Sequence, residues 1–320
     1  MRSKVMSYLG FAAKAGKIVN GYNTCMFMME KKKVKLLAIQ MESAIGNIDL
    51  NIETVKNLLK ANLDKYGECD FVFLPELWPT GWDCPSFPKT AETLQESRTV
   101  KMLQKIAREY KVNIIGGSFV NKCGDKLYNS CPVINRAGEV ICTYDKNHLY
   151  SYNGDTENRY ITTGSNPVMA ELEGVKLGLT ICYDIRFPEI YRAYRKAGAD
   201  ILVNMAAWPK SRKIHWDTLA RARAVENQSY MIALTQTGLL SDGSENLGHS
   251  MIIDFDGKII AEIEDNEGAG VNIGTDESDL QTGVKEGAIY AEINLEKMYE
   301  FRSKCTNLKD VKDSYEVIKK

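Results

Sequence analysis

Hydrophobic and polar positions follow two periods along this chain. Short apolar or alternating runs predict strands within residues 34–41, 69–76, 112–120, 174–184, 199–207, 230–237, 249–264 and 287–295. Helical spacing of apolar residues predicts helices within 47–67, 100–111, 188–198 and 215–228. Residues 126–146 resemble a hairpin that turns at Arg136, Ala137 and Gly138. This alternation predicts an α/β fold, with two mixed sheets facing each other and helices outside.

Two segments interrupt this pattern. Residues 1–32 precede the first core strand, and residues 265–285 are rich in Gly, Asp and Ser with few apolar positions. We expect residues 1–32 to be an N-terminal extension that is not an independent domain, and residues 33–320 to form one domain. The segment 265–285 is expected to be an inserted mobile surface loop or an extended hairpin.

Composition and charge narrow the classes of protein. Lys and Arg total 41 against 42 Asp and Glu, so the formal net charge is -1 and no strong positive field exists for a phosphate backbone. No nucleic-acid partner is expected. The apolar runs are much shorter than a membrane span, and the first residues carry Lys and Gly where a secretory segment would be uninterruptedly apolar. We therefore expect no membrane association and a cytoplasmic location.

The cysteine and histidine positions argue against a disulfide framework and against a metal centre. The cysteines lie at positions 25, 69, 84, 123, 131, 142, 182 and 305, without C-x-x-C spacing and mostly in apolar stretches. His148, His215 and His249 lack the spacing of metal ligands, and a histidine near a sheet rim is more often a hydrogen-bonded supporting group. No metal is expected, and each cysteine is by default inert core filling.

Cys182 differs from the other cysteines in its position. It ends the apolar run GLTI and begins YDIRFPE, a strand end that leads into a helix near Pro188. Open α/β layers bind ligands at such strand ends, so this thiol is a candidate nucleophile. Glu76, after FVFLP, is a candidate general base, and Lys146 in TYDKNHLY could stabilise an oxyanion. Each residue alone would more often be solvated, and it is their combination that favours catalysis.

Three motifs resemble, in this order, the signature blocks of the nitrilase superfamily of carbon–nitrogen hydrolases. They are LPELWPTGW, YDKNHLY and GLTICYDIRFPEIYR, within a similarity that runs from about residue 34 to about residue 294. The resemblance implies a four-layer α-β-β-α sandwich with Glu76, Lys146 and Cys182 as the catalytic triad. ENRYITTG is similar to the motif of the family's second, positioning glutamate, which implies that role for Glu157. Two carboxylates beside one lysine would have coupled pKa values.

The resemblance also implies a mechanism of acyl transfer through a thioester. Glu76 would take the thiol proton, and Cys182 would attack an amide carbonyl. Lys146 and the backbone N–H of Tyr183 would hold the oxyanion. Glu76 would then protonate the leaving nitrogen and activate the water that opens the thioester, so no cofactor is required.

The residues after the cysteine bear on the substrate. Nitrile hydrolysers typically carry Trp-Glu there, whereas this chain has Tyr183 and Asp184, as in amidases and especially in ω-amidase-like proteins. The expected partner is therefore a small-molecule amide. The expected pocket walls, each of which could equally be core, are Trp82, Tyr183, Met205 and Ala206.

Several assignments stay open. Arg186 could bind a substrate carboxylate, although an Arg there more often makes a structural ion pair. Glu226 is expected to buttress the helix behind the site. Alternatives to the amidase are a nitrilase or N-carbamoyl amide hydrolase, a non-catalytic binding or assembly protein, and amide-nitrogen transfer to an acceptor in trans. The family implies a homodimer or higher homo-oligomer, paired around residues 188–196.

The beginning of the chain departs from the nitrilase pattern. SYLGFAAKAGKIVNG and KKKVKLL, within residues 1–37, resemble the opening of a bacterial kink-turn RNA-binding ribosomal protein. The resemblance covers only part of such a domain, which is too little to bury a core of its own. We expect this segment to pack on the hydrolase or to stay partly disordered, and we do not expect it to bind RNA.

Overall fold

The structure is a computed structural model that describes residues 33–151, 157–263, 286–312 and 316–318. The expected N-terminal extension (residues 1–32) and the insertion at 265–285 lie outside the described residues, so both expectations stay predictions. Within the described ranges, no helix is both long and apolar enough to cross a membrane. The expected homo-oligomer and cytoplasmic location also stay predictions.

The described elements follow the alternation that the sequence predicts. One sheet contains β1 (Lys33–Gln40), β2 (Phe71–Phe73), β3 (Asn113–Ile115), β4 (Phe119–Cys123), β5 (Lys126–Ile134), β6 (Val140–Asp145) and β13 (Gly287–Asn294). The other contains β7 (Met169–Leu172), β8 (Val175–Ile181), β9 (Ile201–Ala206), β10 (Tyr230–Thr235), β11 (Ser250–Ile253) and β12 (Ile259–Ile263). The helices are α3 (Ile48–Tyr66), α4 (Phe87–Thr90), α5 (Arg98–Tyr110), α6 (Glu157–Tyr160), α7 (Pro188–Lys196), α8 (Lys213–Asn227) and α9 (Leu295–Lys304). Short 3-10 turns are η1 (Cys84–Ser86), η3 (Cys182–Arg186), η4 (Lys210–Arg212) and η6 (Asn307–Asp310).

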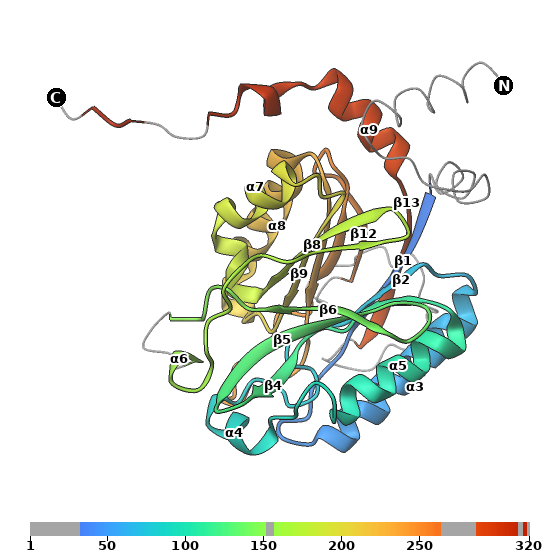
Figure 1. Cartoon of the computed structure of the whole chain (residues 1–320), viewed down its shortest axis with the longest axis vertical. Helices are drawn as coiled ribbons and strands as arrows, with labels where there is room; N and C mark the ends of the chain where they lie inside the picture. Colours follow the sequence, from blue (N-terminus) through green and yellow to red (C-terminus); the bar gives the residue numbers. More distant parts are fainter. Residues whose placement is uncertain (1–32, 152–156, 264–285, 313–315, 319–320) are drawn as a thin grey trace.

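Two sheets lie face to face between two outer layers of helices (Figure 1). The first described sheet has the order β13-β1-β2-β3-β5-β4, with β6 paired to β5, and the second has the order β12-β11-β10-β9-β8-β7. Both are mixed: β1, β2 and β3 are parallel, as are β8, β9 and β10, while the flanking strands are antiparallel. α3 and α5 cover one sheet, and α7 and α8 cover the other. The predicted α-β-β-α sandwich is confirmed.

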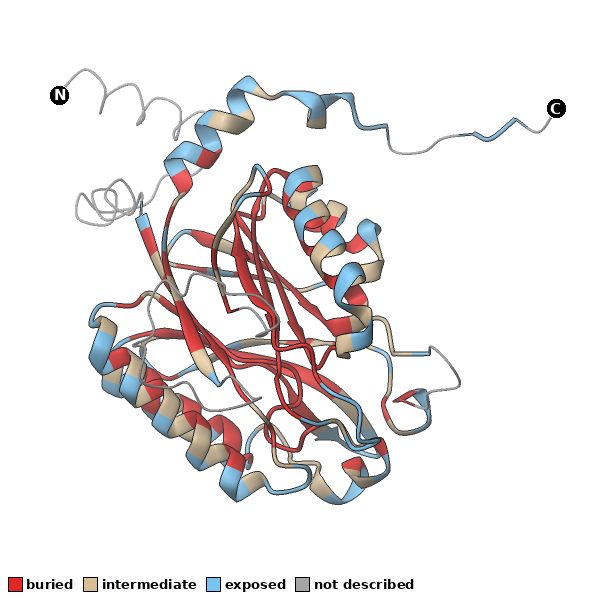
Figure 2. Cartoon of the chain, turned by 180° about the vertical axis from the view of Figure 1, so that it is seen from behind, coloured by how far each residue is buried: buried red, intermediate tan, exposed pale blue. Residues whose placement is uncertain are grey.

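The alternation of side chains along β1 supplies two cores at once. Leu36 and Ala38 pack in the core between the sheets, which continues beneath α7 and α8. Leu37 and Ile39, which point the other way, pack in the core beneath α3 and α5. Figure 2 shows the buried residues on the strands and on the inward stripes of the helices. A strand buried on both faces explains the continuous apolar run from which it was predicted.

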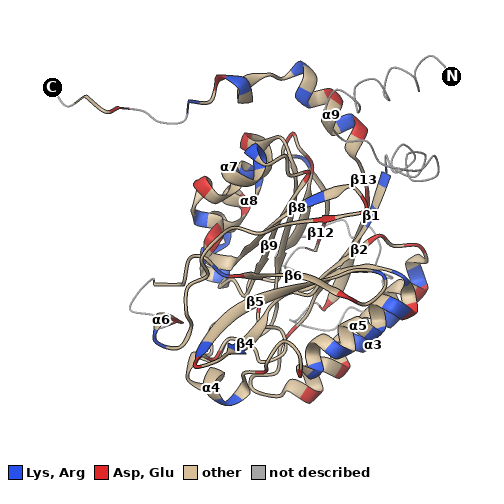
Figure 3. Cartoon of the chain, in the orientation of Figure 1, with Lys and Arg blue, Asp and Glu red and all other residues tan. Residues whose placement is uncertain are grey.

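The outer surface carries charges of both signs. Figure 3 shows Lys and Arg interspersed with Asp and Glu along the outward faces of α3, α5, α7, α8 and α9. Several of these charges are paired, for example Lys56 with Glu53 and Lys304 with Glu300. Such exposed pairs add little stability, so the sandwich is held mainly by its apolar cores.

Two expectations about local structure need correction. The strand predicted within residues 112–120 is broken, because β3 ends at Ile115 and β4 begins at Phe119. Gly117 between them has a φ of +66°, and a Cβ there would lie 2.2 Å from the carbonyl oxygen of Pro75. The backbone N–H of Ser118 donates to that same oxygen, so the break brings this turn against the segment after β2. The sequence pattern also missed β7 and α9.

The packing of α7 on β8 predicts the effect of one substitution. Gly178 in β8 faces Tyr194 of α7, and a Cβ at this glycine would lie 2.5 Å from Tyr194 Cγ. Gly178→Ala should therefore lower the free energy of unfolding by about 1–3 kcal/mol, measured by urea denaturation. In the matched variant Gly287→Ala the nearest atom lies at 3.5 Å, so its stability should change by less than about 0.5 kcal/mol. Equal stability of the two variants would contradict this packing argument.

Candidate active site

The four predicted catalytic residues lie at element ends from both sheets. Glu76 follows β2, Lys146 follows β6, and Cys182 follows β8 as the first residue of η3. Glu157 is the first residue of α6. All four are buried, with at most 5% of a residue exposed. The structure brings them together, whereas their roles in catalysis remain a proposal.

The ammonium of Lys146 is the centre of this cluster. Its Nζ lies 2.9 Å from Glu76 Oε1 and 3.1 Å from each oxygen of Glu157. The Trp82 ring closes another side, with its centroid 5.0 Å from Nζ. Burial alone would lower the pKa of Lys146, but the charges of Glu157 and Glu76 outweigh it and raise that pKa well above its ordinary value. Lys146 is therefore a fully buried cation at neutral pH.

The carboxylate of Glu76 joins the two sheets. Its Oε1 accepts hydrogen bonds from Lys146 and from Asn129 Nδ2, both at 2.9 Å. Its Oε2 accepts from the backbone N–H of Ala207 at 2.9 Å, directly after β9 of the second sheet. The carbonyl oxygen of Ala207 lies 3.8 Å from Cys182 Sγ, so Glu76 Oε2 and the sulfur both contact the backbone of Ala207.

The thiol of Cys182 is protonated in this environment. Burial first, and then the negative charge of Glu76, raise the pKa of Cys182 well above its ordinary value, while Lys146 opposes this rise. The pKa of Glu157 is also raised, chiefly by burial. The charge of Lys146 lowers that pKa, and the charge of Glu76 raises it. A thiol in this state is a poor nucleophile unless a neighbouring base removes its proton, and Glu76 is the adjacent carboxylate.

Cys182 has a strained backbone that its surroundings hold in place. Its φ is +48°, a left-handed conformation that side chains with a Cβ rarely adopt. Asn204 Nδ2 donates to its carbonyl oxygen at 3.3 Å. Arg223 of α8 donates through Nε and Nη2 to the carbonyl oxygen of Ile185, at 3.0 and 2.7 Å. The side chains of Asn204 and Arg223 thus hold in place the turn that contains the thiol.

Asp184, two residues after the thiol, ties this turn to the first sheet. Its Oδ2 accepts from the backbone N–H of Ile181 at 2.9 Å and from the Tyr144 hydroxyl at 2.6 Å. Its Oδ1 accepts from the backbone N–H of His148 at 2.9 Å and lies 2.7 Å from the His148 ring. Because Tyr144 and His148 flank Lys146 in the chain, this carboxylate fixes the nucleophile relative to the ammonium.

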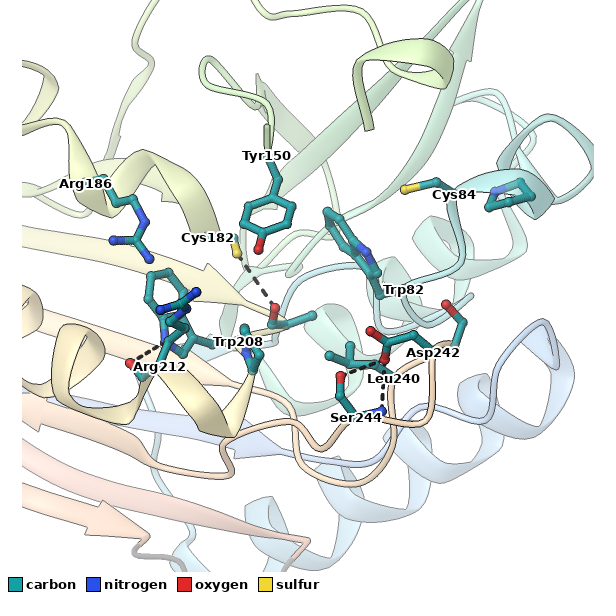
Figure 4. A pocket seen from close by; sticks show the side chains of 14 residues that line it. Trp82, Cys84, Tyr150, Cys182, Arg186, Trp208, Arg212, Leu240, Asp242 and Ser244 are labelled. Carbon is teal, nitrogen blue, oxygen red and sulfur yellow. Dashed lines mark hydrogen bonds between the residues drawn. The ribbon is translucent and has the colours of Figure 1, made fainter. Parts of the chain in front are cut away.

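A cavity of about 230 Å³ opens on Cys182 (Figure 4). Arg186 and Arg212 lie on one side of it, and residues 240–244 of the loop after β10 supply another wall. The complete lining is Trp82, Cys84, Pro85, Tyr150, Cys182, Arg186, Ala207, Trp208, Pro209, Arg212, Leu240, Ser241, Asp242 and Ser244. The cavity therefore combines aromatic walls with two guanidinium groups and one carboxylate.

The expected pocket walls are only partly those of this cavity. Trp82 lines it, but Met205 and Ala206 are fully buried in β9 and do not. The next two residues, Ala207 and Trp208, line it instead, because only there does the chain leave the sheet. Tyr183 is also absent from the lining, and its ring packs edge-on against Tyr150 and Phe187.

The supporting residues expected from the sequence have clear positions. Glu226 lies 2.9 Å from Arg223 Nη1, so it orients the guanidinium that grips the cysteine turn. Arg186 has no carboxylate partner among the described residues; its Nη1 lies 3.2 Å from His215 Nδ1, and its guanidinium lies over the Trp208 ring at 4.9 Å. The histidines at 148, 215 and 249 are each hydrogen-bonded to a neighbouring side chain. In the part of the chain that the structure describes, no three His, Cys, Asp or Glu are grouped as metal ligands.

Comparison with known proteins identifies the family. The model of the carbon–nitrogen hydrolase family matches residues 35–303. The chain belongs to the carbon–nitrogen hydrolase family. It is accordingly a hydrolase that acts on carbon–nitrogen bonds other than peptide bonds. The match begins at residue 35, so the resemblance of residues 1–37 to a ribosomal protein stays a prediction.

Individual relatives place this hydrolase within the family. A protein named 2-oxoglutaramate amidase from Bacillus subtilis is 33% identical over 285 residues, covering 88% of this chain and all of the relative. A protein of the same name from Paenarthrobacter nicotinovorans is 33% identical over 253 residues, covering 76% and 79%. The crystal structure of Saccharomyces cerevisiae Nit3, described as a member of the nitrilase superfamily, has a TM-score of 0.74 and 26% identity, covering 86% and 94%. The resemblance to the amidase branch of the nitrilase superfamily is confirmed.

Several site residues of this carbon–nitrogen hydrolase escaped the sequence analysis. Asn129 contacts both glutamates from the middle of β5, where the alternating pattern indicates only which face a residue takes. Arg223 lies in a helix, where an arginine is usually exposed, so the sequence carries no signal for its buried position. The loop at 240–244 carries no motif, and only its position after a strand end could have suggested a pocket wall.

The contacts of Asp184 predict a loss of both stability and activity on substitution. Asp184→Asn presents an amide N–H₂ to buried donors, so the free energy of unfolding should fall by about 3 kcal/mol. Displacement of the cysteine turn should lower the hydrolase activity of the folded protein on the order of 10²-fold. Both are measurable by urea denaturation and by assays well below the transition.

Asp200→Asn is the matched control for this substitution. Asp200 is also buried, but it lies before the start of β9, whereas the site lies at the end of that strand. There it accepts hydrogen bonds from the backbone N–H of Lys176 and from the Tyr299 hydroxyl. Its variant should lose stability while the folded fraction keeps full activity. Equal activity losses in the two variants would show that Asp184 has no special connection to the site.

Proposed function

We propose that this chain hydrolyses a small-molecule amide to a carboxylate and ammonia through a thioester on Cys182. The observation that carries the proposal is the buried cluster of Glu76, Lys146 and Glu157, connected through the backbone of Ala207 to Cys182, which lines the cavity. Glu76 and Lys146 supply a base and a cation, and Cys182 supplies the nucleophile. The names of the relatives, 2-oxoglutaramate amidase among them, support the same reaction class.

The first half of the proposed reaction forms the thioester. Glu76 Oε2 takes the thiol proton as Cys182 Sγ attacks the carbonyl carbon of the amide. Lys146 has three N–H donors: one points to Glu76, and one is shared between the oxygens of Glu157 at equal distances. The remaining donor, with the N–H of Tyr183 at the start of the cysteine turn, is assigned to the oxyanion. The C–N bond then breaks as Glu76 protonates the leaving nitrogen.

The second half returns the enzyme to its starting state. Ammonia departs and a water molecule gives its proton to Glu76 while its oxygen attacks the thioester carbon. The C–S bond breaks, the sulfur recovers a proton from Glu76, and the carboxylate product leaves. Glu157 accepts from Lys146 and from the backbone N–H of Tyr150 throughout, so its proposed role is to hold the ammonium in place.

The cavity favours an amide that carries a carboxylate at its far end. Arg186 lies in the same 3-10 turn as Cys182 and lines the cavity, and its buried Nε has no hydrogen-bond partner among the described residues. A guanidinium that has no carboxylate partner among the described residues can bind one on a ligand. Of the two roles considered for Arg186, this position favours binding of a substrate carboxylate over a structural ion pair.

Removal of the nucleophile should abolish ammonia release. Cys182→Ala is expected to lower kcat on the order of 10⁴-fold or more, in a panel of amides, nitriles and N-carbamoyl compounds. The matched variant Cys123→Ala removes an exposed thiol at the end of β4 and should keep full activity. With the unmodified chain, hydroxylamine should divert the thioester to a hydroxamate. Full activity of Cys182→Ala would reject the proposal.

Substitution of Arg186 should change selectivity. Arg186→Met is expected to lower kcat/KM for an amide with a distal carboxylate on the order of 10- to 100-fold, since a charge-assisted hydrogen bond is lost. A neutral amide of the same length should be affected much less. The control Arg221→Met removes a guanidinium of α8 that donates to the carbonyl oxygen of Gly257 and should change neither value. Equal losses for both substrates would reject carboxylate binding by Arg186.

A further inference from the structure

The geometry points to a role for Asn129 that no sequence motif indicates. We propose that Asn129 is a positioning residue, which holds Glu76 with one carboxylate oxygen directed to Cys182. This inference rests on the proposed function, in which Glu76 is the base. It goes beyond that function because it adds a neutral donor to the cluster of three charged residues and the thiol.

The backbone places Asn129 beside the ammonium. Asn129 lies in the middle of β5 and is fully buried. Its carbonyl oxygen accepts from the backbone N–H of Lys146 at 2.9 Å, as the chain leaves β6. The strand pairing thus places the two residues side by side, independently of their side-chain contacts.

The side chain of Asn129 bridges the two glutamates. Its Nδ2 lies 2.9 Å from Glu76 Oε1 and 3.4 Å from Glu157 Oε1. Only the N–H₂ end of the amide can face two carboxylates, so the chemistry fixes its orientation. This leaves Asn129 Oδ1 buried without a hydrogen-bond partner in the described structure. A buried orphan acceptor lowers stability, which indicates that the orientation serves the site at a cost to the fold.

The donors around Glu76 determine which oxygen acts as the base. Lys146 and Asn129 both donate to Oε1, whereas Oε2 accepts from the backbone N–H of Ala207, beside the thiol. With two donors on one oxygen and one on the other, the carboxylate cannot rotate without losing hydrogen bonds. Without Asn129, Lys146 alone would hold Oε1, and that ammonium is already shared with Glu157.

Asn129→Leu tests the role, because it keeps the size of the side chain and removes its donors. We expect kcat/KM for amide hydrolysis to fall on the order of 10²-fold, mostly through kcat and with KM nearly unchanged. The rate of Cys182 alkylation by iodoacetamide, followed by peptide mass spectrometry, should also fall, because the base is no longer held toward the thiol. Asn129→Ser, with a shorter side chain, should behave alike and serves if the leucine variant does not fold.

Asn113→Leu is the matched control. Asn113 is buried in β3 of the same sheet, and its amide donates to the carbonyl oxygen of Asp70, away from the site. Its variant should lose stability without a fall in kcat or in the rate of Cys182 alkylation. An unchanged kcat and an unchanged alkylation rate in folded Asn129 variants would overturn the proposal. If the unmodified chain hydrolyses no amide, the proposed function fails, whereas the alkylation rate still decides the role of Asn129.

Discussion

The buried ammonium of Lys146 is the constraint on which this end of the molecule depends. An ion removed from water loses several kcal/mol of solvation unless opposite charges and hydrogen bonds replace the water. Here Glu76 and Glu157 do so from two different segments, so the ion pairs hold the ends of β2 and β6 and the start of α6 together. Loss of either carboxylate would leave a buried charge poorly compensated, typically a cost of about 3–5 kcal/mol. The groups assigned to the chemistry are thus also structural.

The second sheet is brought to this cluster by hydrogen bonds instead of charge. Glu76 accepts from the backbone of Ala207, and Asp184 accepts from residues of both sheets. These contacts hold Cys182 in a strained left-handed conformation directly after a strand. Because the pKa of Cys182 is raised, the proposed chemistry requires an adjacent base, and Glu76, to which we assign that role, follows a strand of the other sheet. The face-to-face packing of the sheets is therefore a condition for the proposed chemistry as well as for the fold.

The sequence predicted those features that local patterns encode. Each residue of the expected triad stands where an apolar run ends, and the sandwich follows from the order of the runs. Met205 and Ala206 do not line the cavity that opens on Cys182, since an apolar run does not show at which residue it leaves the sheet. Asn129 was missed because its partners come from other strands, so its role depends on strand register. The break at Gly117 was missed for a related reason: its left-handed turn is needed only beside Pro75.

The groups assigned to chemistry and the loop that lines the cavity have different positions in the fold. The former are buried at element ends, while one wall of the cavity comes from residues 240–244, on a loop that can vary without moving the strands. Membership of the family therefore indicates which type of bond is cleaved, but it does not determine which molecule contains that bond. Arg186 differs from the loop residues because it shares a 3-10 turn with Cys182, which sets its distance from the sulfur. If it binds the substrate carboxylate as proposed, this turn selects the length of the substrate, and the loop selects its other substituents.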